Sequence, residues 1–246
     1  MEGQESMNKI IISSLSKKYG SKTILNDISL QIETGVFGLF GKNGAGKSTL
    51  LRILAGILPQ SSGSVFVNDI DIADRDAIRA VTGYLPQEFA FYPNFTSFEV
   101  LEYCAGLSGV KSREIREKAE AALADVHLTG QRKVRFSKLS GGMKRRLGFA
   151  QTILHDPNIL IFDEPFTGID TVEKAGLCAL IERLSADKIV IISTHAVSDV
   201  EHLCGRIGIL HNGELAFNGE IAELKPLTAA ESLEEAYLRI VNGELK

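Results

Sequence analysis

The fold is decided by the stretch Gly41-Lys42-Asn43-Gly44-Ala45-Gly46-Lys47-Ser48-Thr49, which follows the pattern G-x-x-x-x-G-K-[ST]. The apolar run 36–40 before it is short enough for a buried strand. The segment 50–55 after it has a helical pattern, which Gly56 and Pro59 end. Between a strand and a helix, the glycines let successive backbone N–H groups face one anion, and the helix N-terminus adds partial positive charge. Residues 41–49, here called the phosphate loop, therefore predict a nucleoside triphosphate site.

The polar side chains of the phosphate loop suit different parts of a triphosphate. Lys47 is expected to reach the β- and γ-phosphates, and the Ser48 hydroxyl is expected to hold Mg²⁺. The other nucleotide-binding residues expected here are Gly41, Lys42, Asn43, Gly44, Ala45, Gly46 and Thr49. The alternative interpretation is a plain glycine turn between a strand and a helix. It does not explain why Lys47 and Ser48 occupy the lysine and serine positions of the pattern.

Composition limits the class of protein. A chain of 246 residues, 44% hydrophobic and 24% charged, is long enough for one large domain or two small ones with a real core. Its net charge of −4 argues against a nucleic-acid partner, because no basic excess is present to displace counterions. The three scattered cysteines form no C-x-x-C pair, which predicts reduced thiols of a cytosolic protein and not a disulfide framework or a zinc site.

The sequence predicts neither a secretory signal nor a membrane span. Residues 1–9 are polar and lack an apolar core, and no run approaches the roughly 18 apolar residues that cross a bilayer. Met1 and Met7 are alternative start residues, and the sequence leaves the choice open.

Strand-like runs recur along the chain, and helical patterns alternate with the later ones. The runs lie at residues 9–13, 28–32, 64–67, 159–162, 188–193 and 207–210. This alternation predicts an α/β fold with a parallel sheet covered by helices. Near the end of the chain, Asn212-Gly213 between two apolar runs predicts a two-residue hairpin, and Ser232 with Glu235 predicts the start of a last helix.

The middle third of the chain is predicted to be helical. Thr96 followed by Glu99 indicates a capped helix over 97–106, residues 112–126 a second helix, and Ser140 the start of a third. We therefore expect one domain over residues 1–246, composed of a core at 7–87 and 156–220, an inserted helical subdomain at 88–155 and a C-terminal helix at 230–246.

Two adjacent acids follow the apolar run 159–162. Because a buried parallel strand presents its C-terminal end to the ligand crevice, Asp163 and Glu164 are expected to emerge beside the phosphate loop. Successive strand residues point to opposite sides, so the two acids can take different tasks. Asp163 suits the Mg²⁺ shell, and Glu164 suits polarising a water for in-line attack on the γ-phosphate.

A second anion-receptive helix start lies at Leu139-Ser140-Gly141-Gly142-Met143. Ser140, Gly141 and Gly142 offer free N–H groups and a hydroxyl. Alone, this pattern is common capping chemistry. Taken in order with the phosphate loop and the acid pair, it resembles the nucleotide-binding subunit of an ATP-binding-cassette (ABC) transporter, and residues 139–143 match the signature segment of that family.

The resemblance covers nearly the whole chain and implies a P-loop NTPase core with a mainly parallel sheet, an N-terminal antiparallel β subdomain and an inserted helical subdomain. It implies ATP and Mg²⁺ as cofactors and ATP hydrolysis as the reaction. The roles that it assigns are adenine stacking by Tyr19, a Mg²⁺ and water contact by Gln87, nucleotide binding by Ser140, Gly141, Gly142 and Asp170, and a γ-phosphate contact by His195.

Two positions depart from the family pattern. Met143 stands where glutamine is usual, so any side-chain hydrogen bond there is lost, while Ser140 and Gly142 are intact. Ile169 replaces the common leucine, which is a near-isosteric change. Activity is expected to survive both.

The resemblance also implies partners. Two subunits, most simply a homodimer, are expected to pair head to tail, with each ATP between the phosphate loop of one and the signature segment of the other. An integral membrane permease subunit is expected as a separate chain. The protein would then lie on the cytoplasmic face of a bacterial cell membrane.

Two further segments have open interpretations. The aromatic residues Phe89, Phe91, Tyr92, Phe95 and Phe98 suit either a docking surface for the membrane subunit or the core of the helical subdomain. The basic run 144–146 suits a solvated helix face, with a phosphate contact as the alternative.

The ending 232–238 and the run 141–146 resemble export-type bacterial ATPases, so drug, peptide or lipid export is favoured over nutrient import. A soluble non-transport ABC ATPase of DNA repair is disfavoured because no heptad run separates phosphate loop and signature segment. A translation factor with two cassettes per chain is disfavoured because each motif occurs only once here. A P-loop kinase or switch would have no use for residues 139–143 and His195. A role in nucleotide binding without hydrolysis is disfavoured because Glu164 is intact. The cargo is not encoded in any residue recognised here.

Overall fold

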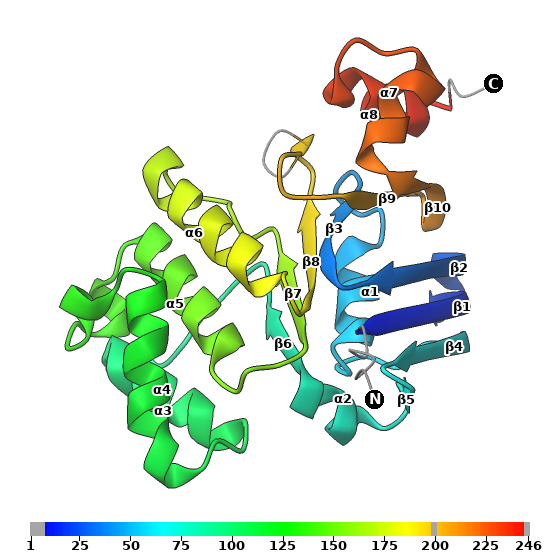
Figure 1. The fold of residues 1–246 in the computed structure, drawn as a ribbon. Helices are drawn as coiled ribbons and strands as arrows, with labels where there is room; N and C mark the ends of the chain where they lie inside the picture. Colours follow the sequence, from blue (N-terminus) through cyan, green and yellow to red (C-terminus); the bar gives the residue numbers. More distant parts are fainter. Residues whose placement is uncertain (1–7, 198–200, 244–246) are drawn as a thin grey trace, which may run out of the picture.

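A computed structural model describes residues 8–197 and 201–243. Met1, Met7 and the C-terminal residues 244–246 lie outside the described residues, so neither the start residue nor the full extent of the predicted segments 7–87 and 230–246 is addressed. Figure 1 shows an antiparallel sheet on one side, a helical lobe on the other, and a second sheet between them.

The N-terminal sheet is four-stranded and antiparallel. In spatial order its strands are β2 (Lys22–Glu33), β1 (Lys9–Tyr19), β4 (Ser62–Val67) and β5 (Ile70–Asp71). Along β2, Ile28, Leu30 and Ile32 are buried while the residues between them are exposed. This alternation is typical of a sheet with one face on the core and one in solvent. The antiparallel β subdomain is thus confirmed.

The central sheet is six-stranded, and its strands are parallel except for the edge strand β10, which runs antiparallel to β9. In spatial order its strands are β10 (Glu214–Glu220), β9 (Arg206–His211), β3 (Gly35–Phe40), β8 (Ile189–Thr194), β7 (Ile159–Asp163) and β6 (Thr82–Leu85). Every residue of β7 and β8 is buried, which explains their continuous apolar sequence. The hairpin at Asn212-Gly213 is confirmed, with φ of 49° and 83° at the two turn residues.

Helices cover both faces of the central sheet (Figure 1). They are α1 (Lys47–Leu54), α2 (Arg75–Val81), α3 (Ser97–Leu107), α4 (Ser112–Asp125), α5 (Gly141–Ile153), α6 (Thr171–Leu184), α7 (Ile221–Thr228) and α8 (Leu233–Val241), with 3₁₀ turns at Thr129–Gln131 and Phe136–Lys138. The predicted capping box of α3 is present, since Thr96 Oγ1 accepts from the Glu99 amide and the Glu99 carboxylate accepts from the Thr96 amide.

The helix expected within 230–246 is present as α8, and a helix that the sequence analysis did not predict, α7, lies before it. Two helices, α7 and α8, pack against each other, and Pro226 lies inside α7. The hydrophobic periodicity of the sequence does not predict α7, because the helix is short and because a helix interior normally excludes proline. Ser232 caps α8 as expected, and Ala236, Tyr237 and Ile240 are buried.

Two clusters of buried side chains fill the molecule, one on each face of the central sheet. One cluster joins the antiparallel sheet to α1 and to β7 and β8 through residues such as Leu51, Ile161 and Ile191. The other joins the helical lobe to the same strands through residues such as Leu147 and Phe162. The helical lobe therefore shares its core with the sheet.

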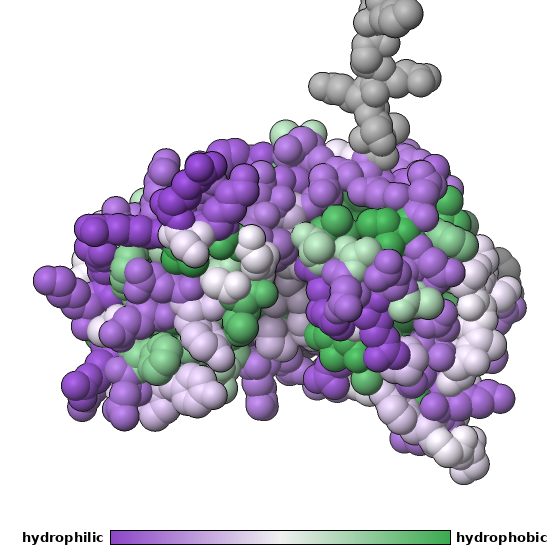
Figure 2. Space-filling view, turned by 90° about the horizontal axis from the view of Figure 1, so that it is seen from below, coloured by the Kyte–Doolittle hydropathy of each residue, from purple (hydrophilic) through white to green (hydrophobic). Residues whose placement is uncertain are grey.

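Four of the five aromatic residues after Gln87 belong to the core of the helical lobe, and the fifth is exposed. Phe89, Phe91, Phe95 and Phe98 pack against the second cluster. Tyr92 is 60% exposed, and its ring contacts Phe91 and Phe95. Seen from below, the surface of the molecule has separate apolar areas divided by hydrophilic residues (Figure 2).

Helix α5 touches strand β6 backbone to backbone. A Cβ on Gly83 would lie 2.2 Å from the Thr152 carbonyl oxygen, and a Cβ on Gly148 would lie 2.6 Å from Leu85 Cδ1. Neither position has room for a side chain, so the two glycines set how closely the helical lobe approaches the sheet.

We expect Gly83→Ala to lower the free energy of unfolding by about 3 kcal/mol, because the added methyl group must push α5 away from β6. Gly106→Ala is the control. Gly106 lies inside α3, and a Cβ added there would have nothing within 4 Å, so this change should stabilise by up to about 1 kcal/mol. Urea unfolding measures both. Equal effects would contradict the described contact.

His155 follows α5 and lies beside Thr82 and Gln151 in a hollow of about 500 Å³. Burial lowers the pKa of its imidazole below the ordinary value of 6.5. Below pH 6.5 the His155 imidazole is therefore protonated more readily in the unfolded chain than in the folded one. The stability contributed by neutral His155 is present above pH 6.5 and is lost as the pH falls toward its lowered pKa.

Between pH 7.5 and 5.5 we therefore expect His155→Gln to flatten the fall in the free energy of unfolding. Because the ring is partly solvated, the difference in slope should stay below the ~1.4 kcal/mol per pH unit of a fully excluded proton. His202→Gln, at an exposed position, should leave the slope as in the wild type. Denaturant titrations at several pH values measure this, and parallel curves for His155→Gln and the wild type would refute it.

Candidate functional site

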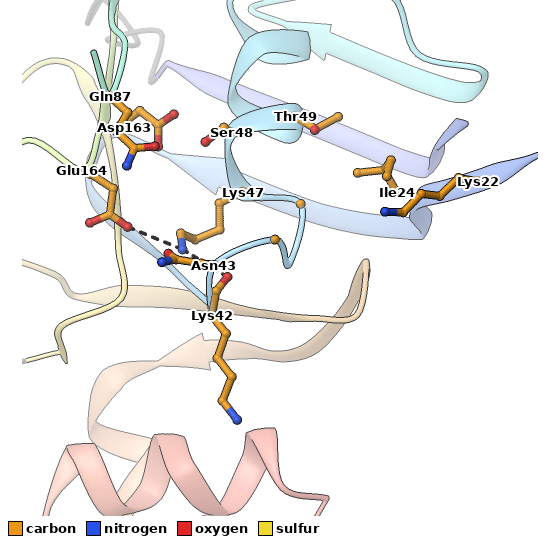
Figure 3. Close-up of a pocket in the computed structure, with 12 residues that line it drawn as sticks. Lys22, Ile24, Lys42, Asn43, Lys47, Ser48, Thr49, Gln87, Asp163 and Glu164 are labelled. Atoms are coloured by element: carbon orange, nitrogen blue, oxygen red, sulfur yellow. Dashed lines mark hydrogen bonds and ion pairs between the residues drawn. The ribbon is translucent and has the colours of Figure 1, made fainter. Parts of the chain in front are cut away.

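A cavity of about 360 Å³ lies where β3 and β7 end, at the amino end of α1 (Figure 3). It brings together most of the phosphate loop, Gln87 and the acid pair. Its wall consists of Lys22, Ile24, Lys42, Asn43, Gly44, Gly46, Lys47, Ser48, Thr49, Gln87, Asp163 and Glu164. Lys22 and Ile24 are lining residues that the sequence analysis missed, because strand β2 gives no sign of which sheet edge it approaches.

The backbone of the phosphate loop requires its glycines. Gly44 and Gly46 have φ of 80° and 109°, and a Cβ on Gly41 would lie 2.6 Å from the Leu210 carbonyl oxygen. Gly46 caps α1 without any side-chain hydrogen bond. The first-turn N–H groups of α1 are therefore left for a ligand at this helix end.

Lys47 and His195 approach one carboxylate. The buried Lys47 ammonium lies 3.5 Å from Glu164 Oε1 and donates to the Gly41 carbonyl at 2.5 Å. On the other side, His195 Nδ1 lies 3.0 Å from Glu164 Oε2. His195 does not line the cavity but reaches it through Glu164. Three residues predicted from separate motifs thus meet at one point, and Figure 3 shows Lys47 directed at Glu164.

The backbone of Glu164 has a left-handed conformation, with φ of 51°. An L-residue other than glycine seldom adopts it, so the neighbouring structure must hold it. The Glu164 amide donates to the carbonyl and to the hydroxyl oxygen of Ser193, each at 3.1 Å. Ser193 thereby fixes one side of the turn that aims the carboxylate.

Asp163 is fully buried and has one oxygen satisfied. Its Oδ1 accepts from the Ser193 hydroxyl at 2.5 Å. Its Oδ2 is buried and finds no hydrogen-bond partner within residues 8–197 and 201–243. A buried carboxylate oxygen without a donor suits a hard cation or a water bound to one, and Ser48 and Gln87 line the same cavity. The donor set therefore fits Mg²⁺.

Ser193 holds both acids by hydrogen bonds, which the sequence analysis missed. It pairs with Asp163 across the parallel strands β8 and β7 and bonds both acids. Its only signal in the sequence is a serine at the end of an apolar strand, and its partner is known only once the strand order is known.

Other predicted site residues lie apart from the cavity. Tyr19 ends β1 with its ring 50% exposed, and the Lys17 ammonium lies 5.0 Å from the ring centre. Ser140 caps α5, accepting from the Met143 amide, and Asp170 caps α6, accepting from the Glu173 amide. Gly141 borders a separate hollow with Gln87 and Gly168, while Gly142 adjoins the Glu173 carboxylate. Within the described part of the chain, the cavity at the phosphate loop thus includes no residue of the signature segment.

The basic run 144–146 was predicted to be a solvated helix face, and for two of its residues this is wrong. Arg145 and Arg146 are 6% and 8% exposed. Arg146 donates to the carbonyls of Val126 and His127 and pairs with Glu173. Arg145 donates to backbone carbonyls around the acid pair. Buried carbonyls supply partners that a helical wheel cannot reveal, which is why the pattern misleads.

The family model that describes ABC transporters matches residues 25–167. This chain belongs to the ABC transporter family. It is the ATP-binding, ATP-hydrolysing subunit type, and such subunits dimerise and work with membrane permease components. Among the described residues, no helix combines the length and apolar character needed to cross a bilayer.

Relatives of this ABC subunit include proteins with named roles. It is 37% identical to the linearmycin resistance ATP-binding protein of Bacillus subtilis over 85% of this chain and 68% of that protein. It is also 37% identical to the Nod factor export ATP-binding protein I of Bradyrhizobium diazoefficiens, with the same coverage of 85% and 68%. A solved ATP-binding subunit of an ABC transporter superposes with a TM-score of 0.86 at 26% identity, covering 94% of this chain and 98% of that one.

We expect Ser193→Ala to lower the free energy of unfolding by about 1–3 kcal/mol, because the buried Asp163 carboxylate loses its donor. Urea unfolding without nucleotide measures it. Ser185→Ala serves as the control, since that hydroxyl bonds the Glu182 carbonyl at an exposed position and its loss should cost less than about 0.5 kcal/mol. A Ser193→Ala protein as stable as the control would contradict the described network.

Proposed function

We propose that this chain binds Mg²⁺–ATP in the cavity at the phosphate loop and hydrolyses it with Glu164 as the general base. The observation that carries the proposal is the buried Glu164 carboxylate, held between Lys47 and His195 beside the phosphate loop. A carboxylate placed there can accept the proton of a water as its oxygen bonds to the γ-phosphorus and the bond to the β-phosphate breaks.

Each predicted side chain has a proposed task. Lys47 binds the β- and γ-phosphates, and these contacts would replace the one between its ammonium and Glu164. His195 contacts the γ-phosphate, and Gln87 orients the water. The remaining nucleotide contacts come from Gly41, Lys42, Asn43, Gly44, Ala45, Gly46, Ser48 and Thr49, with Tyr19 stacking on adenine.

Ser48, Gln87 and Asp163 are proposed to hold Mg²⁺. The buried Oδ2 of Asp163 supports this, because it has no hydrogen-bond partner among the described residues. When bound, the ion neutralises negative charge on the phosphates. Asp163 itself stays fixed by the Ser193 hydroxyl, so its free oxygen keeps one direction.

The second half of each ATP site is proposed to come from a second copy of the chain. Among the residues that the structure describes, the cavity at the phosphate loop is not lined by Ser140, Gly141 or Gly142 at the start of α5, nor by Asp170 at the start of α6. In a head-to-tail homodimer they would face the γ-phosphate bound by the other copy. ATP would close the dimer and hydrolysis would weaken it.

This closure is proposed to power a separate membrane permease subunit, with residues 88–155 as the subdomain that moves against the core at 7–87 and 156–220. The exposed Tyr92 in the aromatic segment after Gln87 suits a contact with that subunit. Similarity to a linearmycin resistance protein and to a Nod factor export protein supports drug, peptide or lipid export as the direction. The chain would work at the cytoplasmic face of a bacterial membrane.

Glu164→Gln tests the proposed base. We expect its turnover of ATP to fall by about 10²–10⁴-fold while fluorescent-nucleotide binding stays within about threefold of the wild type, because the amide cannot accept the proton. The exposed Glu182→Gln is the matched control and should keep wild-type turnover.

The same variant tests the dimer. In sedimentation velocity, Glu164→Gln should be dimeric with Mg²⁺–ATP and monomeric with Mg²⁺–ADP. Unchanged turnover would refute the base, and monomers at saturating ATP would refute the shared sites.

A further inference from the structure

Arg145 lies where three functional segments meet. Its guanidinium is buried between the start of α5, the end of β7 and the residues after β6. It donates from Nη1 to the carbonyls of Pro86 and Gln87, each at 2.7 Å, from Nε to that of Pro165 at 3.1 Å, and from Nη2 to those of Glu164 at 2.7 Å and Asp163.

The partners of this cation are backbone oxygens. No carboxylate forms an ion pair with Arg145 within the described part of the chain. A buried charge is tolerated when its donors are all satisfied, and a planar guanidinium can supply several N–H groups in a fixed fork. A lysine at this position keeps the charge but has one nitrogen, which cannot span carbonyls on separate segments.

These carbonyls belong to the residues on which the proposed chemistry depends. Glu164 has its left-handed backbone held through the amide by Ser193 and through the carbonyl by Arg145. Gln87 has its carbonyl held by the same guanidinium. Arg145 therefore sets the distance between the two residues that would handle the attacking water.

We propose that Arg145 is a positioning residue for ATP hydrolysis: it fixes Glu164 and Gln87 relative to each other and ties both to the helix that begins with the signature segment. This inference rests on the role proposed for Glu164. A contact of Ser140 with the nucleotide of a second copy would then be transmitted through about one and a half turns of α5 to the base of the same chain.

Arg146 offers a matched comparison. It is equally buried and one residue along the same helix, but its partners are the carbonyls of Val126 and His127 and the Glu173 carboxylate. These lie on α6 and after α4, away from the acid pair. A general need for buried arginine in α5 would make the two positions equivalent, whereas the proposal makes them different.

The first experiment uses amide hydrogen exchange on the purified full chain. Arg145→Lys should speed exchange at least fivefold in peptides covering 85–88 and 163–166 and leave those covering 124–128 unchanged. Arg146→Lys should show the reverse pattern. Uniform acceleration in Arg145→Lys, or none at 163–166, would overturn the proposal.

The second experiment is a double-mutant cycle on ATP hydrolysis. Arg145→Lys should lower kcat about tenfold or more with KM changed by less than about threefold, because binding by the phosphate loop is intact. In a Glu164→Gln background the same change should have no further effect within about twofold, whereas Arg146→Lys should act additively.

The outcomes separate the two levels of inference. Unchanged turnover of Glu164→Gln alone would remove the proposed base, whatever Arg145 does. A strong Glu164→Gln defect with additive Arg145→Lys loss would overturn only the positioning role. Arg145→Gln is the second variant. If neither it nor Arg145→Lys showed a cooperative unfolding transition, Arg145 would be a folding residue and the proposal would fail.

Discussion

The contact between the Lys47 ammonium and the buried Glu164 carboxylate joins two parts of the chain that are far apart in sequence. It depends on the strand order β3-β8-β7, which puts the phosphate loop and the acid pair on either side of β8. Ser193, near the end of β8, and His195, just after it, fill the space between them and bond Asp163 and Glu164. Every proposed step of hydrolysis uses a group held by this arrangement.

Buried charge is concentrated around this contact, and each charged group has at least one partner, although Asp163 Oδ2 finds none among the described residues. Lys47 has a carbonyl and a carboxylate, Arg145 has a ring of carbonyls, and Asp163 has a serine hydroxyl. Because a buried ion with a missing partner costs several kcal/mol, the backbone around the site is as constrained as its side chains. The left-handed conformation of Glu164 is one result.

Local sequence was enough to predict the elements whose chemistry is local. The phosphate loop, the α3 capping box and the Asn212-Gly213 turn need only neighbouring residues, and the structure contains all three. Roles created by strand order were out of reach. Ser193 and Lys22 look ordinary until β8 and β2 are placed beside the loop.

The basic run after the signature segment shows the limit of periodicity most clearly. Arginine on a helix is usually solvated, and nothing in the sequence marks the backbone carbonyls after β6 and at the end of β7 as its partners. Pro226 is one reason why α7 was not predicted, since a residue that normally ends helices lies inside one. The roles of the site residues remain those proposed from their motifs and their placement.

Because Gly83 has no side chain, α5 lies directly on the backbone of β6 at this position, and the contact can act as a pivot for the helix. Where Gly83 meets the Thr152 carbonyl, the helix cannot slide along the sheet without a collision, so it can only tilt about that point. Ser140 lies twelve residues away, at the far end of a lever of about 18 Å. A tilt of about 10° would carry its hydroxyl about 3 Å, which is the span of one hydrogen bond.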